Sequence, residues 1–360
     1  MRKLLHMALA MLVLSACEFR ELSSPSNVSY VRVYLNDTEV TNLNTGIFNP
    51  EFVQPGFQRP EIVRVALYDT QTGSQVAERY LRNQGDDAQG HYYEGFIVAE
   101  PGTYMLRAYN FGTESTLIGE EYNWYNAYAY TNKVAESLTS KYKGVTRVTD
   151  GSEAAEKPLP DYPIRWDADP LFVANSTDVT IRPHFGIDTL KNAQGKPWFK
   201  AESIVKLYYL QVGVSGVDYI SGSVALLTGM ASAVHLENLE YRDSEPATLY
   251  LEMKTGAYPD GAYKGLKDYH CIYCTFGTFG RLPDAESVLQ VAFEFSTTYG
   301  EVFEVSMDVV PAFLDSQALD HQWLFIDKVI NIPAPPPGEG GGGLAPSVED
   351  WGDVNSEIVI

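Results

Sequence analysis

The chain has 360 residues, of which 26 are Lys or Arg and 47 are Asp or Glu, so its formal net charge is −21 at pH 7. A protein this acidic lacks the basic surface that releases counterions from phosphates, which excludes nucleic acid as a natural partner. The length exceeds what a single hydrophobic core usually organises, and it therefore predicts two domains.

Residues 1–16 are expected to be a lipoprotein signal peptide. A positive start at Arg2 and Lys3 precedes an apolar run, which is followed by small residues before Cys17. The apolar run is too short to span a bilayer. Cleavage before Cys17 exposes a thiol that takes a covalent lipid, which makes residues 17–27 a lipidated tether. The alternative is an ordinary secretory signal with an incidental cysteine.

The next part of the chain, residues 28–190, is expected to be an N-terminal β-sandwich. Short runs alternate apolar with polar side chains, the pattern of antiparallel sheets with one solvated face. Pro101 and Gly102 suit a tight turn, so the two strands that flank them are predicted to pair as a hairpin. The clearest strands are residues 28–35, 62–68, 92–99 and 103–110.

Residues 120–138 crowd aromatic side chains without clean alternation. Trp124, Tyr125 and Tyr128 are candidate stacking residues for a glycan, since flat ring faces suit the C–H faces of sugars. The other interpretation is a loop that caps the sandwich, with each phenol hydrogen-bonded at its rim. We favour the loop, because the chain contains 24 Tyr residues and many of them cannot be ligand contacts.

Residues 191–333 are expected to be a second antiparallel β-sandwich, after a polar connection over 188–200. Gly300 lies between the last two strands and predicts a hairpin turn. Helical periodicity is limited to a short stretch near residues 314–323, so the fold class is all-β with few short helices. The predicted strands are residues 204–214, 223–227, 247–253, 271–279, 288–296 and 302–309.

The C-terminal residues read as a linker and a separate strand. Residues 334–345 begin with stiff prolines and end in a glycine hinge, which is typical of a linker. Residues 346–360 form a tail that ends in three apolar residues, Ile358, Val359 and Ile360. Such a strand needs a partner edge, either within its own chain or in a neighbouring subunit.

The sequence carries no catalytic signature. A Gly-x-Ser-x-Gly elbow and a His-Glu-x-x-His motif are both missing, and with 47 carboxylates any acidic pair is expected by chance. Cys271 and Cys274 lack the second ligand pair of a metal site and read as structural residues of a strand, a thiol function being the alternative. We expect no enzyme, no metal and no cofactor apart from the lipid on Cys17.

Several short segments resemble the fimbrillin-like lipoproteins of Bacteroidales, especially the minor subunits that anchor fimbriae. The segments are 216–231 with its Leu-Thr-Gly-Met-Ala ending, the Thr-Phe-Gly repeat over 275–280, Asp-Val-Val at 308–310, and 346–351. The resemblance implies two fimbrillin-like (transthyretin-like) sandwiches, fimbrial subunits as partners, and assembly by donation of a strand into a neighbour's groove. The same glycines are also consistent with bulges in ordinary strands.

The resemblance favours an anchor or accessory subunit over a polymerising one. Polymerising subunits of this class carry a distinctive Arg-directed cleavage site, whereas Arg59 and Arg64 lie in the corresponding region without such a site. The expected function is therefore a non-catalytic lipoprotein of the cell surface in fimbrium assembly and cell adhesion. The alternative is a glycan-binding surface lipoprotein of a polysaccharide-uptake system.

The expected location is the outer membrane, through the lipid. Removal of the signal peptide leaves 24 basic and 47 acidic residues, a charge near −23 that repels anionic headgroups. Attachment must then come from acyl chains. Glu18 and Glu21 resemble the surface-export signals of Bacteroidota lipoproteins, although they equally suit solvation of a tether.

Overall fold

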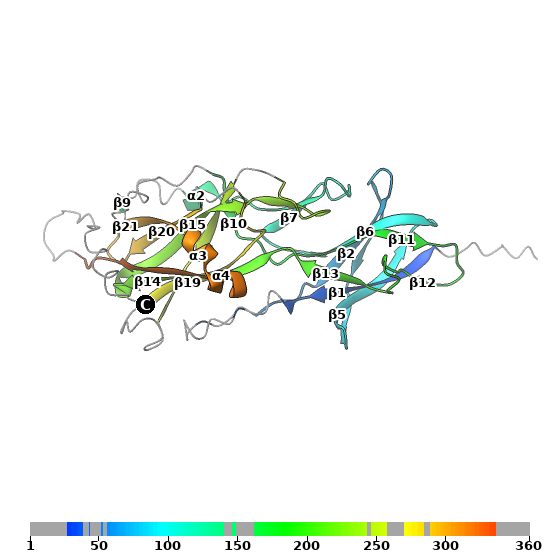
Figure 1. Ribbon diagram of the computed structural model, residues 1–360, viewed down its shortest axis with the longest axis horizontal. Helices are drawn as coiled ribbons and strands as arrows, with labels where there is room; N and C mark the ends of the chain where they lie inside the picture. The colour runs from blue at the N-terminus through cyan, green and yellow to red at the C-terminus, as the bar shows by residue number, and fades with distance from the viewer. Residues whose placement is uncertain are drawn as a thin grey trace, which may run out of the picture.

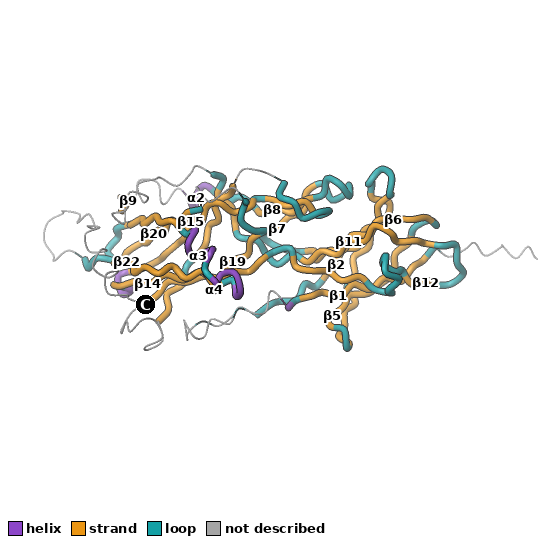
Figure 2. The backbone as a smooth tube through the Cα atoms, viewed as in Figure 1, coloured by secondary structure: helices purple, strands orange, loops and turns teal. Residues whose placement is uncertain are grey.

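The computed structural model describes residues 27–38, 43, 52, 56–139, 146–148, 162–242, 246–257, 270–283 and 289–335. Strands dominate this part of the chain, which confirms the all-β class. They form an elongated body in which two sandwiches follow one another along the long axis (Figures 1 and 2). Among the described residues, no helix is both long and apolar enough to cross a membrane. Cys17 and the tail over 346–360 lie outside the described residues.

The first sandwich is one large sheet that folds over itself. Its strands are β1 (Val28–Asn36), β2 (Ile62–Asp69), β3 (Gln75–Leu81), β4 (Asn83–Asp87), β5 (Gly90–Val98), β6 (Gly102–Phe111), β11 (Phe172–Ile181), β12 (Asp188–Thr189) and β13 (Phe199–Ser203). Their order is β3-β2-β6-β11-β13-β1-β5-β4, with β12 beside β1. Apolar side chains from both halves, among them Val33, Leu67 and Phe172, fill one core.

The hairpin predicted around Pro101 and Gly102 is wrong. Strand β5 pairs with β1 and β4, whereas β6 pairs with β2 and β11, so the turn carries the chain from one half of the sandwich to the other. The reason lies in the core: Ile97 of β5 and Leu106 of β6 are buried in the same apolar cluster. Alternation in the sequence predicts which side chains of a strand face the core. It does not predict which other strand pairs with it.

The second sandwich packs a six-stranded sheet on a four-stranded one. Its strands are β9 (Thr146–Val148), β10 (Ile164–Trp166), β14 (Lys206–Ser215), β15 (Ile220–Ala231), β17 (Pro246–Glu252), β18 (Lys254–Ala257), β19 (His270–Thr278), β20 (Gln290–Thr297), β21 (Val302–Asp308) and β22 (Trp323–Asn331). The orders are β10-β17-β15-β20-β21-β9 and β18-β19-β14-β22. The β20–β21 hairpin is confirmed, and Gly300 adopts φ 89° in its turn.

A small bridging sheet, three short α-helices and one turn of 3-10 helix over Val217–Tyr219 complete the described fold. The sheet consists of β7 (Thr116–Gly119), β8 (Tyr128–Thr131) and β16 (Ala233–His235), in the order β16-β8-β7. The helices are α2 (Glu136–Thr139), α3 (Val310–Leu314) and α4 (Ser316–His321). Tyr109 of β6, Val205 and Val234 belong to one apolar cluster, so the layer between the sandwiches is itself packed.

The structure divides the strands differently from the predicted ranges 28–190 and 191–333. Strand β13 follows residue 191 but pairs with β1 and β11 of the first sheet. Strands β9 and β10 precede residue 190 but pair with β21 and β17 of the second sandwich. Burial of Phe199 and Ala201 in the first core explains the position of β13. The two sandwiches are therefore interlocked rather than simply consecutive.

Gly277 of β19 packs directly against residues 167–168, where the chain crosses between the two sandwiches. The Ala168 N–H donates to the Gly277 carbonyl at 2.9 Å, and the Gly277 N–H donates to the Asp167 carboxylate at 3.1 Å. A Cβ atom at position 277 would lie 1.9 Å from the Ala168 carbonyl oxygen. Only glycine fits there, which gives the first Gly of the Thr-Phe-Gly repeat a packing role.

We expect Gly277→Ala to lower the free energy of unfolding by about 1–3 kcal/mol, because backbone atoms must move apart to admit the methyl group. Gly222→Ala is the matched control, since nothing lies within 4 Å of the added atom. Its effect should stay within about 0.5 kcal/mol. Chemical denaturation measures both, and equal losses would contradict the steric account.

Candidate functional site

The three candidate residues for stacking on a glycan, Trp124, Tyr125 and Tyr128, differ in their surroundings. Trp124 is 1% exposed, and its ring meets the Tyr68 ring edge-on at 5.6 Å between centroids. The Arg107 guanidinium carbon lies 4.2 Å from the Trp124 ring centroid. Because the indole is buried and in contact with other protein side chains, these contacts argue against a stacking role for Trp124 and favour the capping loop.

Tyr125 and Tyr128 have different neighbours, so they are held by separate contacts. Tyr125 is 44% exposed and rests on Gly73, where an added Cβ would come within 2.6 Å of the ring. The ring of Tyr128 is covered by Arg242, whose guanidinium carbon lies 3.4 Å from the ring centroid. The loop that carries Trp124 and Tyr125 and leads into β8 is tied to the chain just before β3, because the Trp124 N–H donates to the Gly73 carbonyl at 2.7 Å. These contacts support the interpretation as a capping loop.

Under this loop lie two fully buried arginines that the sequence did not reveal as a pair. Arg64 donates to Glu78 at 2.7 Å and to the Tyr109 hydroxyl at 2.8 Å, and Arg107 donates to Asn175 at 2.9 Å. Burial lowers the pKa of Arg107 to about 10. Alternation places both side chains on the outer face of the sheet, and the capping loop is what removes them from water. Because Arg64 is buried in β2, it is not an accessible cleavage site.

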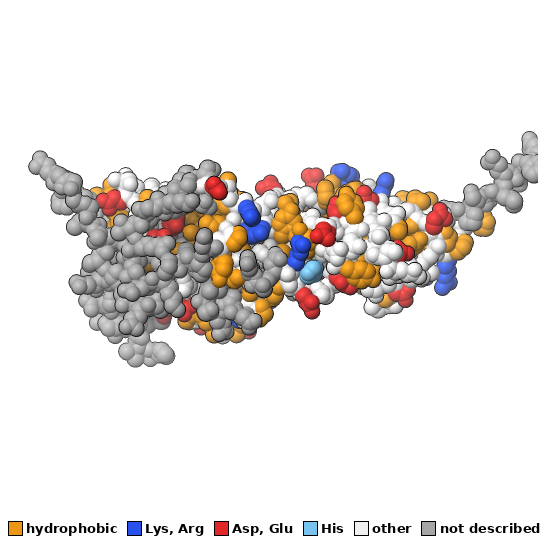
Figure 3. All heavy atoms as spheres, turned by 90° about the horizontal axis from the view of Figure 1, so that it is seen from above, with side chains coloured by type: hydrophobic (Ala, Val, Ile, Leu, Met, Phe, Trp, Pro, Cys, Tyr) orange, Lys and Arg blue, Asp and Glu red, His pale blue; other side chains and the backbone are white. Residues whose placement is uncertain are grey.

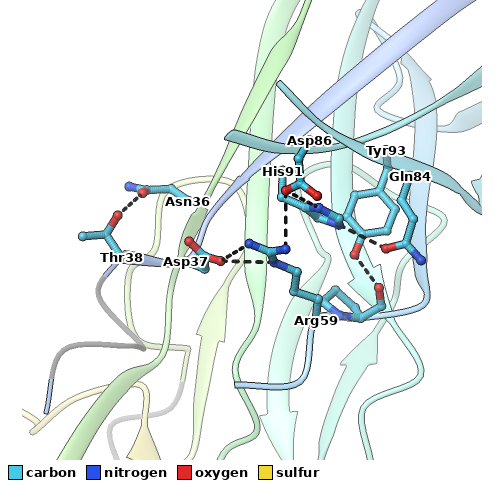
Figure 4. A network of polar contacts seen from close by, with 9 residues as sticks. Asn36, Asp37, Thr38, Arg59, Gln84, Asp86, His91 and Tyr93 are labelled. Atoms are coloured by element: carbon cyan, nitrogen blue, oxygen red, sulfur yellow. Dashed lines mark hydrogen bonds and ion pairs between the residues drawn. The ribbon is translucent and has the colours of Figure 1, made fainter. Parts of the chain in front are cut away.

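Arg59 lies instead in an exposed network at the edge of the first sandwich (Figure 4). Its guanidinium contacts Asp37 and Asp86, each at 3.4 Å, and Asp86 in turn contacts the Nδ1 atom of His91 at 3.1 Å. The Tyr93 hydroxyl donates to the Pro60 carbonyl next to Arg59. Exposed ion pairs of this kind stabilise a protein by at most about 1 kcal/mol each. The network fixes the loop before β2 against β1, β4 and β5.

Two hollows, with volumes of about 540 and 430 Å³, lie where residues 166–170 pass the second sandwich. Both are lined by Asp167, and burial raises the pKa of this carboxyl to about 6. The carboxylate of Asp169 accepts hydrogen bonds from the backbone N–H groups of Ser115 at 2.6 Å and Glu114 at 2.8 Å. These carboxyl groups therefore hold backbone segments together.

The residues that the structure describes give little support for a metal site or a reactive thiol. No group of three or more His, Cys, Asp or Glu side chains is arranged there to hold a metal ion. Cys271 and Cys274 are buried and lie three positions apart on β19. Burial raises the pKa of the Cys274 thiol, which disfavours the reactive thiolate.

The described chain enters and leaves the body at opposite ends (Figure 1). Strand β1 begins at Val28 beside β12, because Ser29 pairs with Asp188 at the tip of the first sandwich. Strand β22 runs parallel to β14 and ends at Asn331, which pairs with Ser215 at the far end of the second sandwich. The predicted lipid site Cys17 and the predicted pairing residues Ile358, Val359 and Ile360 lie outside the described residues, so their roles stay predictions.

We expect Trp124→Ala to lower the free energy of unfolding by about 3–5 kcal/mol, as for other buried large aromatic residues. Tyr125→Ala is the comparison, and because this ring is partly exposed its cost should be below about 1 kcal/mol. Denaturation of both variants measures the difference. If Trp124 were a ligand platform instead, its removal would leave stability unchanged.

Comparison with known proteins extends these observations. The family described as "Domain of unknown function (DUF5119)" matches residues 54–252. The "Putative fimbrium anchoring subunit Fim4B" of Bacteroides ovatus is 24% identical over 373 residues, which cover 98% of this chain and 96% of that protein.

A solved structure shares the fold. The crystal structure of a putative adhesin from Bacteroides ovatus ATCC 8483 has a TM-score of 0.52 and 21% identity, covering 86% of this chain and 94% of its own. The fimbrial anchor protein Mfa2 from Porphyromonas gingivalis has a TM-score of 0.41 and 13% identity, covering 84% and 90%. The resemblance to fimbrillin-like proteins is thereby confirmed, and the chain belongs to the family described as a domain of unknown function, DUF5119.

Proposed function

We propose that this protein is a fimbrial anchor or accessory subunit, held in the outer membrane by a lipid on Cys17 and facing the cell surface. The observation that carries the proposal is the position of the two ends. The chain enters at the tip of the first sandwich and leaves at the opposite end of the second (Figure 1). A protein that links a membrane to an external polymer needs this arrangement.

The entry strand is well placed to bear a load. Strand β1 lies inside its sheet, with β5 antiparallel on one side and β12 and β13 parallel on the other. Strand β13 in turn pairs with β11, which continues the sheet toward β6. A pull on the tether is therefore shared among hydrogen bonds on both edges of β1.

The exit strand leads directly to the proposed partner-binding segment. After β22, the Ile332 N–H donates to the Ser215 carbonyl at 3.0 Å, and the Tyr299 hydroxyl donates to the Pro333 carbonyl at 2.9 Å. These contacts fix the chain up to the start of the linker over 334–345. The tail over 346–360, with its apolar end, is the strand that we propose to pair with another fimbrial subunit.

A non-catalytic role is part of the proposal. It is supported by the names of the similar proteins, which describe a fimbrium anchoring subunit and an adhesin. The glycan-binding alternative has less support, because the Trp124 ring is buried and the Tyr128 ring is covered by Arg242.

Deletion of residues 344–360 tests the proposal in cells that produce the fimbriae. We expect the truncated protein to reach the outer membrane but to lose co-purification with fimbrial subunits. Ile358→Ser, Val359→Ser and Ile360→Ser together should reproduce the loss, since they remove the apolar strand face. Asn355→Ala with Ser356→Ala is the matched control. Unchanged co-purification of the deletion variant would rule out strand donation by the tail.

A further inference from the structure

The tip at which the chain enters the first sandwich carries an unusual set of exposed apolar side chains. Phe185 is 76% exposed, and Ile187 and Val98 are each 62% exposed. We call these three residues the tip patch. Figure 3 shows hydrophobic side chains at the right-hand end of the body.

Strand register brings the members of the tip patch together. Val98 is the partner of Val28 in the β1–β5 pairing, and both lie on the outer face, opposite to the buried Ile97 and Ser29. Ile187 directly precedes Asp188, which pairs with Ser29 on the other side of β1. The patch therefore surrounds the residue at which the chain enters the fold.

The loop that carries Phe185 is clamped to the entry strand by His184. The Nε2 atom of His184 lies 2.9 Å from the Val28 carbonyl oxygen, and its Nδ1 atom lies 2.7 Å from the Arg182 carbonyl oxygen. Because both ring nitrogens face acceptors, the protonated ring satisfies both, and these contacts raise the pKa of His184. The clamp presents Phe185 outward instead of letting the loop fold back.

The charge around the patch also differs from that of the whole chain. Residues 182–191 contain two cationic side chains, Arg182 and Lys191, against the single carboxylate of Asp188, in a protein with a net charge of −21. Nearby, the carboxylate of Glu100 accepts a hydrogen bond from Asn27 at 3.1 Å. Arg182 and Lys191 thus balance Asp188 and Glu100, so an anionic surface repels this end less than the net charge of the chain suggests.

We propose that the tip patch dips into the bilayer that holds the Cys17 lipid and so fixes how the body stands on the membrane. The inference rests on the proposed function, because it requires the lipid. Ten residues lead from Cys17 to Asn27, a length that spans at most about 35 Å when fully extended. The acyl chains alone hold the protein at the membrane but leave its orientation free. Phe and Ile side chains at the headgroup boundary remove that freedom.

The test uses the full-length lipidated protein, reconstituted at low density in vesicles of phosphatidylethanolamine and phosphatidylglycerol with brominated acyl chains. An environment-sensitive fluorophore is attached through Val98→Cys, and in a separate variant through Leu319→Cys. Leu319 is a matched control, since it is 66% exposed but lies on α4 in the second sandwich. Cys271 and Cys274 are buried and do not compete for the label in the folded protein.

We expect bromine to quench the fluorophore at position 98 at least about twofold more than at position 319, because only the tip reaches the acyl boundary. Adding Phe185→Ser and Ile187→Ser should abolish the excess quenching, while flotation shows that the lipid still holds the protein. Both side chains are exposed, so their replacement should leave thermal unfolding unchanged.

Three outcomes would overturn the inference. They are equal quenching at the two positions, excess quenching that survives the serine variant, and a signal that disappears on dilution of the protein within the bilayer, which would indicate that a second copy covers the patch. Failure of the full-length protein to float with vesicles would instead refute the lipid anchor itself, and the tip patch with it.

Discussion

The rest of the structure depends on how the chain crosses between the two sandwiches. At the crossing, Ala168 and Asp167 form backbone and carboxylate hydrogen bonds with Gly277, at 2.9 and 3.1 Å, and the space leaves no room for a Cβ atom on that glycine. On the other side of Ala168, the carboxylate of Asp169 holds the N–H groups that precede β7. As a result, β9 and β10 pair within the second sandwich although they come early in the chain, and β13 pairs within the first although it comes later. These crossings join the two ends of the body through packed, hydrogen-bonded structure.

Local features of the fold were predictable, whereas the choice of neighbours was not. Alternating side chains predict strand β1, and Gly300 predicts the β20–β21 hairpin, because both signals lie within a few residues. The partners of β5 and β6 depend on a core assembled from distant segments, so the tight turn between them was misread as a hairpin. The same limit applies to Trp124, since its burial depends on Tyr68 and Arg107.

The candidate functional features follow the same division. The sequence does not show that Arg59 is exposed and Arg64 is buried, because the burial of Arg64 depends on the capping loop that covers it. The tip patch was equally hidden, because Val98 and the loop that carries Phe185 are far apart in the chain, and each is placed by its own contact with Val28. In the proposed function, the acidic body acts as a spacer between membrane and partner that is not attracted to an anionic membrane.

The central claim is that the interlocked sandwiches behave as one mechanical unit between membrane and partner. Differential scanning calorimetry of the full chain tests it most directly. The account predicts one cooperative transition, with equal calorimetric and van't Hoff enthalpies. The reason is that the chain passes between the sandwiches more than once, so the strands of one sandwich are continuous with those of the other. Two separate transitions would show that the sandwiches unfold independently, and would contradict the claim.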